Sequence, residues 1–248
     1  MVLTVDAEHL GTSERRWRRS GRLRQLRPLE IGRPHRVAVV APHPDDEVLG
    51  AGGLIRRLVL GGADVRIVAV TDGEASHPGA PDGMGARRHG ESLTALRRLG
   101  AGATMVTSLG IPDGHVGDHL EELLPALEHQ LRGADLALAP WRHDGHPDHD
   151  ACGVATARVT AGTDTRRLDY LVWAWHWSDP WSDDIPWKDC RRLDLDPVTH
   201  ARKRWSTRAY RSQIRPSRAP APAPPVLPRA VLARLRRNVE IFVDGGAG

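Results

Sequence analysis

The chain of 248 residues is long enough for one well-buried core, and its 40% hydrophobic and 27% charged residues argue against a disordered or fibrous chain. The formal net charge of +4 is too small to imply nucleic-acid binding by itself. Because Cys152 and Cys190 are the only cysteines, the sequence excludes a disulfide framework and a cysteine-rich zinc cluster. We therefore expect a reduced, cytoplasmic protein whose metal site, if present, is built from histidine and carboxylate side chains.

A basic segment opens the chain, with seven arginines within residues 15–27. Such a run can bind an acidic partner or a membrane surface, but a solvated helix is the simpler explanation. The first apolar stretch is residues 37–40, so the sequence predicts neither a secretory signal nor a membrane span. We assign residues 1–30 to a basic N-terminal segment.

Downstream of this segment, short apolar runs alternate with stretches of helical spacing. The predicted strands are residues 36–41, 65–71, 104–109, 134–140 and 170–175. The predicted helices are residues 50–60, 87–99, 119–131 and 152–160. Repeated strand–helix units predict a single-domain, Rossmann-like α/β fold with a mainly parallel sheet and helices on both faces. In such a fold the functional site lies beyond the C-terminal ends of the strands.

The C-terminal part of the chain has a different composition. Residues 216–228 contain six prolines spaced mainly by alanine and serine, which predicts an extended linker. Residues 241–243 are a candidate edge strand that returns to the sheet. We therefore expect a main domain over residues 31–215 and a C-terminal segment, residues 216–248, that packs back on it.

Five of the eight tryptophans fall within residues 173–187. Trp173, Trp175 and Trp177 alternate along the last predicted strand, so we expect them to share one face and to lie mostly in the core. Trp181 and Trp187 follow in a predicted loop that also contains several aspartates. Packing of this loop on the sheet and a sugar-binding aromatic wall are both compatible with the pattern.

The first predicted strand is followed directly by His43-Pro-Asp-Asp-Glu47. A histidine and two carboxylates at a strand-to-helix turn bring nitrogen and oxygen ligands into one small volume, and the helix N-terminus favours anionic side chains there. A catalytic zinc ion typically takes three protein ligands and leaves one position for water. A further ligand is therefore expected at the end of another strand.

The fourth predicted strand is followed by a second such cluster, His146-Pro-Asp-His149. Gly145 and Pro147 mark a loop that turns the two histidines inward before the next helix. The residues alone do not decide which of Asp45 and Asp46 is a metal ligand and which is a base.

Together these two motifs resemble the PIG-L/LmbE family of zinc-dependent N-acetylglucosaminyl deacetylases. Arg88 and Glu91 are similar to the family's Arg-x-x-Glu helix, although a salt bridge between the two would also explain that pair. Residues 109–114 resemble the family's loop after the third strand. The matching features cover residues 36–160, about half of the chain.

The resemblance implies a hydrolase that removes the N-acetyl group from an N-acetylglucosamine-type conjugate, a small-molecule substrate. It implies that His43, Asp46 and His149 bind the metal, which is zinc or, alternatively, another divalent ion such as Fe²⁺. Residues 72–86 and 176–192 are expected to select the aglycone.

The resemblance also implies roles for the polar residues around the metal. Asp45 acts as the general base on the attacking water, and a protonated His146 stabilises the tetrahedral oxyanion. Asp148 orients His146 by a hydrogen bond. Arg88 and Asp113 contact the polar part of the substrate.

Two other functions remain open at this point. One is a non-catalytic metal-binding protein, against which the presence of Asp45 argues. The other is a nucleic-acid or acidic-partner binder that uses the arginines of residues 15–27. We expect no nucleic-acid partner and no membrane span, and a homo-oligomer is compatible with the sequence.

Overall fold

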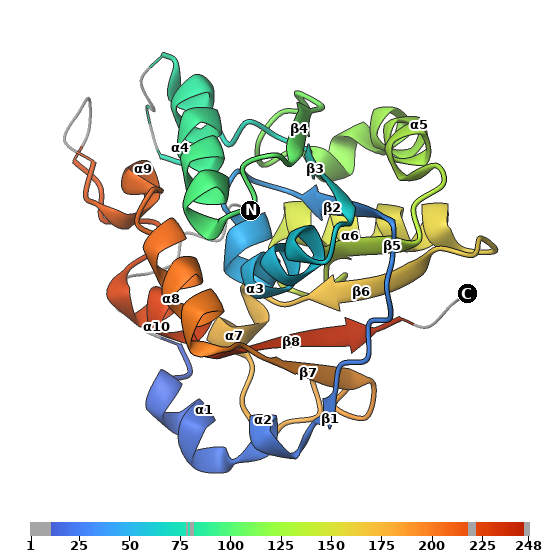
Figure 1. The fold of residues 1–248 in the computed structure, drawn as a ribbon. Helices are drawn as coiled ribbons and strands as arrows, with labels where there is room; N and C mark the ends of the chain where they lie inside the picture. Colours follow the sequence, from blue (N-terminus) through green and yellow to red (C-terminus); the bar gives the residue numbers. More distant parts are fainter. Residues whose placement is uncertain (1–10, 78, 80–81, 218–221, 246–248) are drawn as a thin grey trace.

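The computed structural model describes residues 11–77, 79, 82–217 and 222–245. Within them, the strands are β1 (Arg27–Pro28), β2 (Arg36–Ala41), β3 (Asp64–Ala69), β4 (Met105–Ser108), β5 (Leu136–Pro140), β6 (Arg166–Tyr170), β7 (Cys190–Asp194) and β8 (Val239–Asp244). They form one sheet in the order β1-β7-β8-β6-β5-β2-β3-β4 (Figure 1). β8 is antiparallel to its neighbours β6 and β7, and the other pairs are parallel. The predicted α/β fold with a mainly parallel sheet is confirmed.

Helices cover both faces of this sheet. They are α1 (Glu14–Ser20), α2 (Arg22–Gln25), α3 (Asp46–Leu60), α4 (Met84–Leu99), η1 (Val116–His119, a 3₁₀ helix), α5 (Leu120–Leu131), α6 (Pro147–Thr160), α7 (Ala174–Trp177), α8 (Pro197–Ser206), α9 (Arg211–Ile214) and α10 (Arg229–Leu235). In β2, Val37 and Val39 pack into the core with α3 and α4, whereas Ala38 and Val40 pack into a second core with α5 and α6. Burial on both faces explains why this strand is a continuous apolar run. No helix of the described residues is long and apolar enough to cross a membrane.

The range 170–175 is not the strand that the sequence predicted. β6 ends at the first residue of this range, and the short helix α7 follows, so the tryptophans do not share one sheet face. Trp175 is buried, whereas Trp177 is 44% exposed. The backbone N–H groups of residues 172–174 donate to the Asp144 carboxylate, and this local anchor replaces strand pairing.

Several boundaries differ from the expectation, and two of them concern the site and the order of the sheet. Helix α6 begins at Pro147, inside the predicted loop, because proline is favourable in the first turn and the His146 ring accepts the N–H of Asp148 as a cap. The C-terminal strand β8 is longer than predicted, and it lies inside the sheet between β6 and β7 instead of at an edge.

The N-terminal helices pack against the rest of the molecule. Trp17 of α1 is 1% exposed, and its indole N–H donates to the carbonyl of Trp175. Three of the seven arginines have intramolecular partners: Arg16 pairs with Asp179, Arg18 pairs with Glu14, and Arg22 lies over the ring of Trp187.

A buried ion pair connects the C-terminal strand to α8, and its carboxylate also binds α3. Lys203 Nζ of α8 lies 2.6 Å from Glu240 Oε1 of β8, and both side chains are at most 2% exposed. The same carboxylate accepts the backbone N–H groups of Gly53 and Leu54 in α3. This contact fixes α3, and therefore its N-terminal residues, relative to the sheet.

Candidate metal centre and active site

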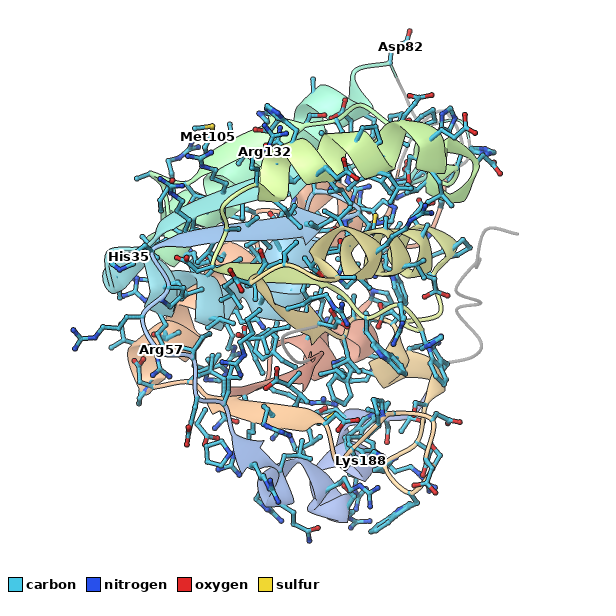
Figure 2. The ribbon with its side chains drawn as sticks, turned by 90° about the vertical axis from the view of Figure 1, so that its right-hand side faces the viewer. His35, Arg57, Asp82, Met105, Arg132 and Lys188 are labelled. Carbon is cyan, nitrogen blue, oxygen red and sulfur yellow. The ribbon has the colours of Figure 1, made fainter. Side chains whose placement is uncertain are left out.

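The two sequence clusters meet at the C-terminal edge of the sheet. In Figure 2, β2 starts beside the labelled His35 and runs into the middle of the molecule. His43 follows β2, Asp46 is the first residue of α3, and His149 lies in the first turn of α6, which follows β5. Because β2 and β5 are adjacent parallel strands, the two loops that follow them are neighbours.

His43, Asp46 and His149 form a compact set of three ligand atoms. His43 Nδ1 and His149 Nε2 each lie 3.2 Å from Asp46 Oδ2, and all three ligand atoms are within 4.8 Å of one another. The three residues are buried, and within the described part of the chain His149 Nε2 has no hydrogen-bond partner of acceptable geometry. A buried imidazole nitrogen without a hydrogen-bond partner can use its lone pair to bind a metal ion. Two histidine nitrogens and one carboxylate suit zinc, and they also suit Fe²⁺.

Asp144 fixes the orientation of His149. Its Oδ2 lies 2.8 Å from His149 Nδ1, and both side chains are fully buried. A carboxylate at Nδ1 holds the ring proton there and leaves the lone pair of Nε2 for the metal. Sequence reasoning missed this residue, because a single acid in a loop has no distinctive spacing.

His43 is surrounded by three carboxylates. Its Nε2 lies 3.1 Å from both Asp113 Oδ1 and Asp148 Oδ2, while Asp46 lies on its other ring nitrogen. Burial acts to lower the pKa of His43, but hydrogen bonds with Asp113, Asp148 and Asp46 outweigh it and raise the pKa well above its ordinary value. So many carboxylates in a buried space require positive charge, which a bound cation would supply.

Asp45 lies beside the ligand set and contacts Arg88 of α4. Arg88 Nη2 is 3.3 Å from Asp45 Oδ2, and Arg88 Nη1 donates to the carbonyl of Gly73 at 2.9 Å. Gly73 has φ +65°, and an added Cβ there would lie 2.1 Å from the guanidinium, so glycine is required for this approach. Burial raises the pKa of Asp45 to about 7, with Arg88 lowering it and the Asp46 and Glu47 charges raising it.

Residues 38–160 match the model of the family described as PIG-L: GlcNAc-PI de-N-acetylase. The chain carries a PIG-L family domain. Both metal-ligand clusters fall inside the matched range.

Proteins similar to this PIG-L chain bear deacetylase names. It is 32% identical over 130 residues to a diacetylchitobiose deacetylase of Thermococcus kodakarensis, covering 48% of this chain and 46% of the relative. It is 42% identical over 160 residues to a 1D-myo-inositol 2-acetamido-2-deoxy-alpha-D-glucopyranoside deacetylase of Rhodococcus opacus, covering 52% of this chain and 55% of the relative. The chain thus spans about half the length of these curated relatives.

Solved structures share the fold of the PIG-L chain. The N,N'-diacetylchitobiose deacetylase of Pyrococcus horikoshii aligns with a TM-score of 0.56 and 22% identity, over 73% of this chain and 71% of that one. The conserved protein TT1542 of Thermus thermophilus aligns with a TM-score of 0.60 and 24% identity, over 86% of this chain and 95% of that one. At these identities the likeness concerns the fold.

Three residues of the PIG-L domain have contacts that differ from the expected ones. The Asp148 carboxylate meets His43 and the N–H groups of Gly114 and Val116, whereas Asp148 contacts His146 through its backbone N–H. Arg88 contacts Asp45, as described above, while Asp113 contacts His43 and accepts the N–H of Ala75. Arg88 and Asp113 therefore each contact another residue of the site.

His146 lies at the side of the metal set. Its ring centroid is 4.9 Å from that of His43 and 5.1 Å from that of His149, and its Nδ1 accepts the N–H of Asp148. Burial, followed by the charges of His149 and His43, lowers the pKa of His146 to about 3. Because Nδ1 accepts this hydrogen bond, the neutral ring carries its proton on Nε2.

Glu47 holds the backbone of Asp45 in place. It is fully buried, its Oε2 accepts the backbone N–H of Asp45 at 3.0 Å, and its Oε1 accepts the hydroxyls of Ser92 and Tyr210. Burial raises the pKa of Glu47 despite the hydrogen bond from Ser92. The sequence left the role of this residue open between helix capping and the site.

Proposed function

We propose that this protein is a metal-dependent N-deacetylase that hydrolyses the acetamide of an N-acetylglucosamine-type conjugate to a free amine and acetate. The observation that carries the proposal is the convergence of His43, Asp46 and His149 within 4.8 Å, next to the buried carboxyl of Asp45. The names of the relatives support the reaction and the amino sugar.

The metal would be held by His43, Asp46 and His149, and we propose zinc, with Fe²⁺ as the alternative. When bound, such an ion supplies Lewis-acid polarisation of the amide carbonyl and makes water more acidic. Asp144 keeps the His149 ring in the tautomer that leaves Nε2 free.

Asp45 is proposed as the general base. It takes a proton from the attacking water and passes it to the amine nitrogen as the C–N bond breaks, so that water and amide become amine and acetic acid. A pKa of about 7 suits a group that must accept and release a proton near neutrality. Arg88 and Glu47 hold this side chain and its backbone in place.

His146 is proposed to stabilise the tetrahedral oxyanion. As a neutral ring whose Nδ1 is already an acceptor, it offers Nε2–H as a hydrogen-bond donor. Contacts of Arg88 and Asp113 with sugar hydroxyls remain a prediction.

The experiment that tests this function measures acetate release from N-acetylglucosamine conjugates by zinc-loaded protein, together with metal content. Asp45→Ala should keep its metal but lower kcat at least about 100-fold, in keeping with the usual contribution of a general base. His149→Ala should lose the metal. His115→Ala serves as the control, because this histidine is 65% exposed and pairs with Asp118.

Metal binding without acetate release from any conjugate would overturn the deacetylase assignment and favour a binding role. Full activity of Asp45→Ala would instead overturn the assignment of the base while leaving the reaction in place.

A further inference from the structure

The ring of Trp173 contacts the ring of His146, which in turn lies beside the metal ligands His43 and His149. Its ring is inclined by 25° to that of His146, with the centroids 6.3 Å apart. The backbone N–H of Trp173 donates to Asp144, the same carboxylate that orients His149. The N-terminal end of α7 is therefore built into the wall of the proposed active site.

Trp177, one turn further along α7, is held rigidly although it is exposed. Its indole N–H donates to the carbonyl of Asp144 at 2.7 Å. Its ring also lies against Gly145, where an added Cβ would come within 2.5 Å of the indole nitrogen. Nevertheless 44% of Trp177 is exposed to solvent. Because Gly145 directly precedes His146, this fixed indole lies at the rim of the site.

The indole of Trp177 differs in its surroundings from a similarly exposed indole elsewhere. Trp205 of α8 is 46% exposed, but the guanidinium groups of Arg98 and Arg202 lie 5.4 and 5.6 Å from its ring. Among the described residues, neither an aromatic ring nor a guanidinium lies over Trp177 in this way. A rigid aromatic surface that is left open beside a catalytic site is typical of ligand binding.

We propose that Trp177, supported by Trp173, forms a subsite for a ring-shaped polyol, a second pyranose or a cyclitol, that is linked to the N-acetylglucosamine whose amide is cleaved. This inference rests on the proposed function. The indole face would receive the apolar C–H face of the ring, while the hydroxyls at the ring edge stay in water. Trp177 therefore selects conjugates with a ring aglycone over those with a small linear one.

The test compares two substrates that contain the same acetamide. Methyl N-acetylglucosaminide has a small aglycone, and N,N'-diacetylchitobiose has a second pyranose. Trp177→Ala should lower kcat/KM for diacetylchitobiose about tenfold through KM, the equivalent of ~1.4 kcal/mol. With the metal site saturated by zinc, it should change kcat/KM for the methyl glycoside less than about twofold. Trp177→Phe should retain most of the preference, and Trp205→Ala should leave both substrates unaffected.

A second measurement follows binding without turnover. In the Asp45→Ala background, calorimetry with diacetylchitobiose should show weaker binding when Trp177→Ala is added. Equal losses on both substrates, or no loss on either, would overturn the subsite while acetate release by the wild type keeps the deacetylase function. If the wild type releases no acetate from either substrate, the function fails and the subsite fails with it.

Discussion

The guanidinium of Arg88 lies 3.3 Å from the carboxylate of Asp45, and both side chains are at most 7% exposed. Burial raises the pKa of Asp45, and Arg88 opposes that shift by favouring the ionised carboxylate. Arg88, which the sequence suggested as a substrate contact, thus sets the protonation of the proposed base.

Replacing Arg88 should therefore change the pH dependence of the reaction. Without the guanidinium, the pKa of Asp45 rises above about 7, so the ionised base is present only at higher pH. In Arg88→Ala, the acidic limb of the kcat profile should move to higher pH, and the loss of activity should be larger at pH 6.5 than at pH 9, at unchanged metal content. Arg88→Lys should reverse part of the shift. An equal loss at every pH would show that Arg88 acts only on the structure.

Asp144 is predicted to control metal affinity. Asp144→Asn keeps the shape of the side chain but removes the charge that holds the proton on His149 Nδ1. Substitutions of this kind usually weaken metal binding about 10- to 100-fold. Competition with a zinc chelator measures the effect. Asp118→Asn is the control, because this carboxylate is 76% exposed and pairs with His115. Unchanged affinity in Asp144→Asn would contradict the proposed orientation of His149.

Gly50 should not tolerate a side chain. An added Cβ would lie 2.2 Å from the ring of Tyr170, which cannot move easily because its hydroxyl donates to the carbonyl of Val40. Gly50→Ala should lower the free energy of unfolding by ~1–3 kcal/mol through overpacking, even though alanine is the better helix former. Gly117→Ala, where nothing lies within 4 Å of the added Cβ, should leave it nearly unchanged. Urea unfolding of both variants measures these free energies.

The Lys203–Glu240 pair should be costly to break from one side. Lys203→Met leaves a buried carboxylate without its cation and should lower the free energy of unfolding by ~3–5 kcal/mol. The double variant that also carries Glu240→Gln should recover part of this loss. Arg66 and Asp64 form an exposed ion pair. Arg66→Met should lower the free energy of unfolding by less than ~1 kcal/mol. A small effect in Lys203→Met would mean that the backbone N–H groups of α3 suffice to hold Glu240.

The sequence predicted elements well where one local signal determined them. The apolar run of β2 was consistent with a strand buried on both faces, and its bounds were predicted correctly. The residues 43–47 and 146–149 were expected to meet because each cluster follows a strand of a parallel sheet, and the structure shows that these two strands are neighbours. Helix α6 begins at Pro147, earlier than predicted. Its N-terminal cap is His146, which also belongs to the second histidine motif.

Features that depend on distant partners were not predictable in this way. The aromatic run after β6 looks like a strand, but its N–H groups are taken by Asp144, some thirty residues earlier in the chain. β8 is inserted between two strands, and no local pattern specifies an interior position. The supporting role of Glu47 depends on Tyr210, which lies 163 residues away.

Asp144 links metal binding to the segment that is proposed to contact the aglycone. It holds the metal ligand His149 and also the backbone at the start of α7, and the neighbouring carbonyl of the same residue holds Trp177. Changes in α7 that adapt the rim to a new aglycone therefore act on the residue that tunes metal affinity. We expect laboratory evolution of substrate range in this segment to be accompanied by shifts in metal affinity, so that new specificity and retained metal must be selected together.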